Sequence, residues 1–309
     1  MSKMYNEELK IRFIQSRAKE VTLPLRYLER EFEKIAPFET KLEKDVCNFS
    51  FYDIIDYYKF LNLTSIEGIE ILNSQFLIYT DWCFKQNLVN DGQNHFRELR
   101  RDDYYNCINK AKLKMSVFDR EDIINMIDDL PNPKDQFIIL ALFEGIKGKD
   151  FSDLTLLKPE HISGNIITLP SGKNIQVSDE LIDYANKAIE EKFYYSMSGK
   201  MEKVIPLTDL GYIIKSYPNV DPTIDDTFQI GRRLYKGLMR LFAFLGMEHI
   251  KANDIYNSGM IYSIKENAKK HNMSCKDYIY SEYFESEIEE RYKHINDKKN
   301  LLKKYEDCL

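Results

Sequence analysis

The chain has 309 residues, of which 43% are hydrophobic, enough for two ordinary domains with packed cores. Its formal net charge of −6 gives the whole chain none of the basic excess that usually marks a nucleic-acid binder. No apolar run approaches the roughly 18 residues that a membrane span needs, the first residues do not form a signal peptide, and the five cysteines form no C-x-x-C pair. These features predict a cytoplasmic protein with free thiols and no metal site.

The chain has a helical pattern to about residue 115, and residues 1–90 are predicted to form a helical domain. Apolar residues recur there at three- and four-residue spacing: Leu25, Leu28, Phe32 and Ile35. Pro37 is expected to end this helix. A second helix is expected over residues 51–61 with Ser50 as its N-cap, and a third begins near Ser65.

Residues 91–115 are predicted to form a basic linker. Asp91-Gly92 breaks the helical pattern. Six basic side chains follow: Arg97, Arg100, Arg101, Lys110, Lys112 and Lys114. One interpretation is that this linker crosses a DNA backbone, and the other is an ordinary solvated loop and helix. The sequence leaves both interpretations open.

A second domain is predicted over residues 116–309. The apolar run 137–143 is typical of a buried helix core. Two β-branched segments then flank Pro170-Ser171-Gly172-Lys173, a pattern that predicts a β-hairpin over residues 165–177. Helices are expected to resume over residues 179–191.

The segment 229–242 is the best candidate for a DNA-contact helix. Residues 231–276 contain nine Lys or Arg and three Asp or Glu, a local balance of +6 in an acidic chain. On a helix, Arg233, Lys236 and Arg240 share one face with Arg232 beside them, while leucines share another. The basic face would meet phosphates. The alternative is an amphipathic helix whose charges are merely solvated.

One motif carries a specific resemblance. Phe143-Glu144-Gly145-Ile146-Lys147 followed by Phe151-Ser152-Asp153-Leu154 is similar to the first active-site box of tyrosine recombinases, the phage integrase family. The family's essential arginine then falls at Lys147. Asn253 and Tyr256 stand where the family carries a histidine and its second arginine. Lys173 is the candidate for the family's hairpin lysine, and Tyr292 occupies the place of the nucleophile.

These replacements bear on the chemistry that the resemblance implies. Two arginine forks neutralise the charge that develops on the scissile phosphate, and losing one such donor typically costs roughly 10²–10³ in rate. Lys147 supplies a point charge without a fork, Tyr256 supplies no charge, and Asn253 does no acid–base work near neutral pH. A catalytically inactive homologue is therefore expected. Lys147, Lys149 and Lys173 are either kept as DNA contacts or are ordinary exposed lysines of a loop and a turn. Tyr292 is interpreted as a packed residue of the last helix.

The resemblance spans residues 10–295 and implies a mainly α fold with a small β-hairpin or sheet (α+β). Its architecture has two domains, a helical SAM-like core-binding domain and a catalytic-like domain. The chain is most similar to the integrase-like repressors of SPβ-type Bacillus phages. That subgroup implies a sequence-specific transcriptional repressor that maintains lysogeny, binds double-stranded operator repeats and needs no cofactor. It also implies release by a regulatory protein, by the phage's peptide-signalling (arbitrium) pathway or by DNA damage.

Two other functions stay open at this point. One is a divergent but active recombinase that uses Tyr292, and the other is a protein-interaction antagonist of an integrase. The oligomeric state, monomer or weak dimer, is open as well. An apolar stripe near the C-terminus needs a partner in its own chain or in a neighbouring subunit: Ile288, Tyr292, Ile295, Leu302 and Tyr305.

Overall fold

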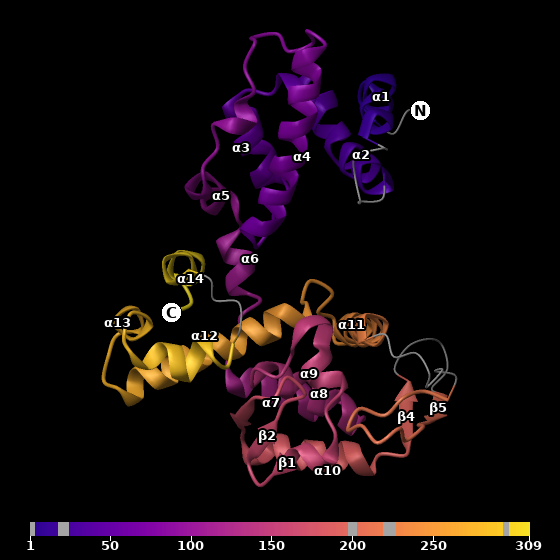
Figure 1. Cartoon of the computed structure of the whole chain (residues 1–309), viewed down its shortest axis with the longest axis vertical. Helices are drawn as coiled ribbons and strands as arrows, with labels where there is room; N and C mark the ends of the chain where they lie inside the picture. The colour runs from indigo at the N-terminus through magenta and orange to yellow at the C-terminus, as the bar shows by residue number, and fades with distance from the viewer. Residues whose placement is uncertain (1–3, 18–24, 197–202, 219–226, 293–296) are drawn as a thin grey trace. The chain divides into compact units, whose positions relative to one another are not determined.

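The computed structural model describes residues 4–17, 25–196, 203–218, 227–292 and 297–309. The chain divides into two compact units, Met1–Leu113 and Lys114–Leu309. Both are built mainly from helices, and the small sheets lie in the second unit (Figure 1). The predicted fold class is confirmed.

The first unit is a set of helices around an aromatic core. Its elements are α1 (Glu7–Arg17), α2 (Leu25–Leu42), η1 (Val46–Asn48), α3 (Phe51–Phe60), α4 (Ile66–Lys85), η2 (His95–Arg97), α5 (Arg101–Cys107) and α6 (Lys110–Lys114). The Phe13 ring meets those of Phe32 and Tyr79 edge to face. As predicted, Ser50 caps α3, and its side chain accepts a hydrogen bond from the backbone of Asp53.

The prediction that Pro37 ends its helix was wrong, because α2 continues to Leu42. A proline removes one backbone donor from a helix, and burial of the next turn offsets that loss. Phe38 and Glu39 are buried there. The Glu39 carboxylate pairs with the fully buried Lys10 and accepts a hydrogen bond from the backbone of Val46. The turn after Pro37 is thus part of the core.

Residues 91–115 contain η2, α5 and α6 and do not form an extended linker without secondary structure. Both η2 and α5 pack against α3 and α4 within the first unit. Phe96 and Tyr105 are buried in that packing. The role of this segment at a DNA backbone stays a prediction.

The second unit surrounds one apolar helix, α8. Its helical elements are α7 (Arg120–Asp128), α8 (Pro133–Phe143), η3 (Lys149–Phe151), α9 (Ser152–Thr155), η4 (Pro159–His161), α10 (Asp179–Glu190), α11 (Thr227–Phe244), α12 (Ala252–Lys270), α13 (Cys275–Ile279), η5 (Glu285–Glu289) and α14 (Lys298–Tyr305). The helices α7, α10 and α12 pack against α8, and every residue from Phe137 to Phe143 is buried. The apolar run in the sequence is therefore a helix core, as predicted.

Two small antiparallel sheets complete the second unit. The strands β1 (Ile162–Ser163), β2 (Ile166–Thr168) and β3 (Asn174–Gln176) form one sheet, in which Ile167 lies opposite Ile175. This sheet confirms the predicted hairpin, and α10 confirms the helix expected after it. The strands β4 (Phe193–Ser196) and β5 (Lys203–Pro206) form the second sheet.

Candidate functional site

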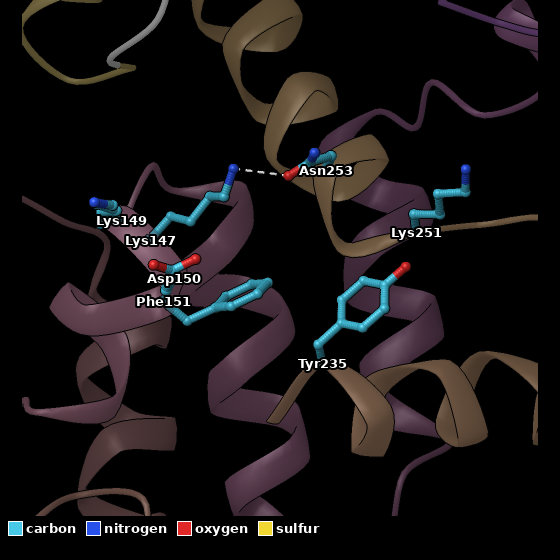
Figure 2. A pocket seen from close by; sticks show the side chains of 8 residues that line it. Lys147, Lys149, Asp150, Phe151, Tyr235, Lys251 and Asn253 are labelled. Atoms are coloured by element: carbon cyan, nitrogen blue, oxygen red, sulfur yellow. Dashed lines mark hydrogen bonds between the residues drawn. The ribbon is translucent and has the colours of Figure 1, made fainter. Parts of the chain in front are cut away.

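A cavity of about 320 Å³ opens at the position of the family's first arginine (Figure 2). Its walls come from the loop that follows α8, from the middle of α11 and from the start of α12. The lining residues are Lys147, Gly148, Lys149, Asp150, Phe151, Tyr235, Lys251 and Asn253. Figure 2 shows Lys147 extending to Asn253, with the rings of Phe151 and Tyr235 below them in this view. We call this cavity the lysine pocket.

The loop that forms the pocket is held in an unusual conformation. Asp150 (φ 51°) and Phe151 (φ 64°) are consecutive non-glycine residues in the left-handed region, which costs about 1 kcal/mol for each residue. The second turn of α11 packs closely against this loop, since a Cβ on Gly231 would lie 1.9 Å from the carbonyl oxygen of Asp150. The glycine therefore permits the close approach that keeps the loop in place.

Lys147 is bonded across the pocket to a residue 106 positions later. Its Nζ donates a hydrogen bond to Oδ1 of Asn253 over 2.7 Å, and lies 4.9 Å from the ring centroid of Tyr256. Burial lowers the pKa of Lys147 from its ordinary value. Lys147 thus contacts both Asn253 and Tyr256, the two residues predicted to stand at the family's histidine and second arginine.

Tyr292 lies behind Tyr256 and is 1% exposed. The two rings meet edge to face with centroids 5.3 Å apart. The Tyr292 hydroxyl donates to the carbonyl oxygen of Phe143 over 2.8 Å and lies 3.2 Å from Oγ of Ser263. Burial raises its pKa, so the hydroxyl keeps its proton at neutral pH.

A buried carboxylate fixes the residue next to Tyr292. Glu144 lies at the end of α8, and its carboxylate pairs with Arg120 at 3.3 Å and with Arg291 at 3.6 Å. The same carboxylate accepts hydrogen bonds from the backbone and side chain of Ser178. Arg291 also donates from Nε to the backbone oxygen of Glu144 over 2.9 Å. Tyr292 is therefore anchored through its neighbour as well as through its hydroxyl.

The start of α12 places two of the pocket's polar side chains. The Asp254 carboxylate accepts a hydrogen bond from the backbone of Lys251 over 2.8 Å, which fixes the first turn of the helix. Lys251 and Asn253 then both face the pocket. The positive end of the helix dipole adds to the charge of the lysines. With three lysines and one carboxylate on its walls, the pocket suits a phosphate group held by point charges.

Lys173 lies just before β3 at the tip of the hairpin and is half-buried. The tip is tied to the recombinase-like box, because the Ser171 backbone donates to Oδ1 of Asp153 over 3.1 Å. Lys173 is outside the set of residues that line the lysine pocket. Its role as a DNA contact stays a prediction.

The four basic residues of α11 are exposed, namely Arg232, Arg233, Lys236 and Arg240. Arg233, Lys236 and Arg240 share a face, as predicted, and line a second cavity instead of the lysine pocket. Of the residues of α11, it is Tyr235 that lines the lysine pocket. Three of the four basic residues of α11 therefore line a different cavity from the lysines of the lysine pocket.

In the first unit, two of the three candidate arginines are engaged by acids. Arg97 lies 2.5 Å from the Asp81 carboxylate, and Arg101 lies 3.3 Å from that of Glu70. Arg100 is exposed at the start of α5. A DNA contact by Arg97 or Arg101 would have to replace these ion pairs.

The sequence analysis missed Tyr235 and Lys251. Lys251 stands two residues before Asn253, so the same box contained the signal for it. Tyr235 lies between basic residues on α11, and only the packing of Gly231 on the loop shows that this side of the helix meets the pocket.

The C-terminal apolar stripe packs within its own chain as far as it is described. Ile288, Tyr292 and Tyr305 are buried, and Leu302 is partly buried. Ile295 lies outside the described residues. Self-packing therefore accounts for this stripe.

No helix among the described residues combines the length and apolar character needed to cross a membrane. Within the same residues, no cluster of histidine, cysteine and carboxylate side chains has an arrangement that would hold a metal ion.

Comparison with known proteins matches both parts of the chain to one family. Residues 4–85 match the family model described as MrpR, N-terminal core-binding domain, and residues 117–305 match MrpR, C-terminal catalytic domain. Over 225 residues the chain is 24% identical to the SPbeta prophage-derived uncharacterized protein YopR of Bacillus subtilis (strain 168). That alignment covers 69% of this chain and 67% of the relative.

Proposed function

Since the chain belongs to the MrpR family of tyrosine-recombinase-type proteins, with a core-binding and a catalytic-type domain, we propose that it is a transcriptional repressor. It binds specific operator sequences in double-stranded DNA, keeps a prophage lysogenic and performs no recombination. The relative YopR is described as prophage-derived, which supports a role in the biology of an integrated phage.

The observation that carries the proposal is the burial of Tyr292 away from the lysine pocket. A nucleophile must reach the phosphorus atom in line. The ring of Tyr256 contacts both Lys147 at the pocket and Tyr292, and the Tyr292 hydroxyl is bonded to the end of α8. Attack would require breaking that bond and moving a buried ring. No arginine replaces the two that the chemistry needs, because Lys147 and Tyr256 stand at those positions.

DNA binding is supported by different features. A core-binding domain implies binding of DNA. The lysine pocket keeps Lys147, Lys149 and Lys251, which suit a backbone phosphate without the fork geometry of catalysis. The exposed basic side chains of α11 supply further phosphate contacts or contacts to guanine in the major groove. Release of repression would fall to a regulatory protein that displaces the DNA.

The test is a gel shift of the purified full chain against fragments of phage and host DNA, followed by denaturing electrophoresis of the shifted bands. Salt-sensitive, sequence-selective shifts without a covalent adduct are expected. A covalent adduct that disappears in Tyr292→Phe would establish a divergent recombinase instead. The absence of any shift at physiological salt would favour an antagonist that binds an integrase.

A further inference from the structure

A second cavity, of about 590 Å³, lies on the other side of α11 from the lysine pocket. Its walls come from α8, the end of α9, β4, β5, the segment 210–217 and α11. The sheet is tied to α8 by Asn132, whose side chain donates to the backbone oxygen of Tyr195 and accepts from its backbone nitrogen. The cavity's shape is thus set by a structured frame, and its volume is in the range of sites for small organic molecules.

Lys134, a buried lysine between two tyrosine rings, forms one wall. Its Nζ lies 4.4 Å from the ring centroid of Tyr194 and 4.5 Å from that of Tyr217. The two rings meet edge to face at 5.4 Å, and Asp135 is buried beside them. Desolvation makes such cation–ring contacts stronger than on an open surface. This wall therefore offers aromatic faces that are already held in place.

The opposite wall is cationic. Arg233, Lys236 and Arg240 project from α11 along the cavity. Within the described part of the chain, no carboxylate forms an ion pair with any of these three side chains. Burial raises the pKa of Tyr217 and the positive charge of Arg240 opposes that rise, so at least this cation lies near the aromatic wall of the same cavity. Among the described residues, these three cations are therefore not neutralised by an ion pair and can serve as charge partners of a bound anion.

Gly237 adds an independent observation. It lines the cavity in the interior of α11, between Arg233 and Arg240 on the same face. A glycine at such a position costs about 1 kcal/mol relative to alanine. No atom lies within 4 Å of a Cβ built on it, in contrast to Gly231 and Gly259. Among the described residues no packing contact requires a glycine here, and the position leaves open space along the cavity.

Much of the remaining lining is apolar, with Ile138, Leu241 and Phe244 among its members, and its polar members are Thr155, Ser196, Lys215 and Ser216. We propose that this cavity binds a small organic anion, with an apolar or aromatic body against Tyr194 and Tyr217 and a carboxylate or phosphate group at Lys236 and Arg240. A DNA backbone presents phosphates and sugars, which gain little from contact with an aromatic and aliphatic lining. A small molecule with an apolar body therefore fits the cavity better than DNA does.

Binding of this anion would control the protein. Arg233, Lys236 and Arg240 are three of the side chains assigned to DNA, so the anion and DNA compete for the same charges. This competition rests on the proposed function, whereas the binding site does not.

The binding site is tested by fluorescence titration of the full chain with anilinonaphthalene sulfonate, an aromatic body that carries one anionic group. Saturable binding at one site is expected. Gly237→Leu fills the cavity from a position where no chain atom obstructs Cβ, and should weaken binding at least about tenfold. Gly237→Ala leaves most of the volume and should change the dissociation constant less than about twofold. Equal binding by Gly237→Leu and the wild type would overturn the site.

The charge requirement is tested by Lys236→Gln with Arg240→Gln. This double variant should lose at least about fivefold in affinity for the probe, while Lys187→Gln, at an exposed lysine on α10, should not. Displacement of the probe by benzoate or by phenyl phosphate then distinguishes a carboxylate from a phosphate head. An unchanged affinity in the double variant would contradict an anion site, even where the probe binds.

The competition is tested by repeating the gel shift at a saturating probe concentration. Loss of the shift in the wild type, with retention in Gly237→Leu, is expected. If the DNA gel shift is undiminished while the probe is bound, competition between the anion and DNA is refuted. The cavity would then still be a ligand site. Should the chain bind no DNA at all, the titration still decides the cavity on its own.

Discussion

The ring of Tyr256 meets the ring of Tyr292 edge to face, with centroids 5.3 Å apart. One of these residues stands where the recombinase family carries an arginine, and the other where it carries the nucleophile. On its other side Tyr256 contacts the Nζ of Lys147. Tyr256 thus packs against both Lys147 and Tyr292, and Tyr292 is part of the core.

Tyr292→Phe should leave operator binding unchanged, because the ring keeps its contact with Tyr256 and no DNA contact depends on the hydroxyl. Removing the hydroxyl leaves the carbonyl oxygen of Phe143 without that donor, so the free energy of unfolding should fall by about 1–3 kcal/mol. Urea denaturation and a gel shift measure the two effects. Folded protein that no longer represses would contradict the packed-tyrosine interpretation.

Replacing lysines of the lysine pocket should flatten the salt dependence of DNA binding. Each phosphate contact contributes about 0.9 to the slope of log affinity against log salt concentration. Lys147→Gln with Lys251→Gln should therefore lower that slope by close to 2 while selectivity between sequences persists. Binding isotherms at several salt concentrations measure this. Lys187→Gln serves as the control and should leave the slope as it is.

Arg232→Ala or Arg240→Ala should weaken DNA binding. If the side chain contacts a base, the loss should be about 1–3 kcal/mol of binding free energy. If it contacts a phosphate, the slope of log affinity against log salt concentration should become smaller. Fluorescence anisotropy with operator and scrambled duplexes separates these outcomes, since loss at a base contact narrows the gap between the two duplexes. Full affinity in both variants would remove α11 from the DNA-binding surface.

Stability of the second unit should fall as pH rises toward neutrality. Burial raises the pKa of Glu191 from its ordinary 4.5 to about 7. The folded protein then holds a proton that the unfolded chain releases near pH 4.5, so this contribution is full below pH 4.5 and is lost as pH rises through 7. In Glu191→Gln the free energy of unfolding should fall less as pH rises. At pH 8 it should exceed that of the wild type by on the order of 1 kcal/mol, allowing for solvent screening.

Thermal unfolding of the full chain at pH 5 and pH 8 tests this expectation. The exposed neighbour Glu190 gives the matched variant Glu190→Gln, which should follow the wild type at both pH values. A Glu191→Gln protein with the same pH dependence as the wild type would show that Glu191 is ionised when folded.

Gly259→Ala should unfold or severely destabilise the second unit. A Cβ at this position would lie 1.6 Å from the carbonyl oxygen of Phe143, which is also the acceptor of the Tyr292 hydroxyl. Overpacking against a rigid backbone should cost at least about 3 kcal/mol. Gly237→Ala, in an open position on α11, should instead stabilise by about 0.5–1 kcal/mol. Denaturation of the two variants side by side gives the comparison.

Much of the fold follows from local patterns. The spacing of apolar residues predicted α3, α4 and α8, and the turn at Gly172 predicted the hairpin, because each of these depends on residues close in sequence. The failure at Pro37 has a different origin. The turn beyond it is stabilised by Lys10, a residue 29 positions from Glu39 that no helical pattern connects to it.

The site was predicted only in its separate parts. The segment around Lys147 and the pair Asn253 and Tyr256 could be identified because they resemble a family motif with different residues at its catalytic positions. Their mutual contact, across 106 positions, comes from the packing of α12 on α8. The position of Tyr235 required the close approach of Gly231 to Asp150, which is a tertiary fact. The second cavity had no counterpart in the sequence patterns, because its walls come from six separate segments.

The hydrogen bond from Tyr292 to Phe143 also bears on the order in which the protein is made. The first unit has all its residues once residue 113 is synthesised, so it can fold as soon as it leaves the ribosome. The second unit has to wait, because the end of α8 receives its donor from a tyrosine 149 residues later. During that interval α8, the most apolar helix of the second unit, lacks its contact with Tyr292. Nascent chains arrested before residue 292 should therefore depend on chaperones, whereas those arrested after it should not.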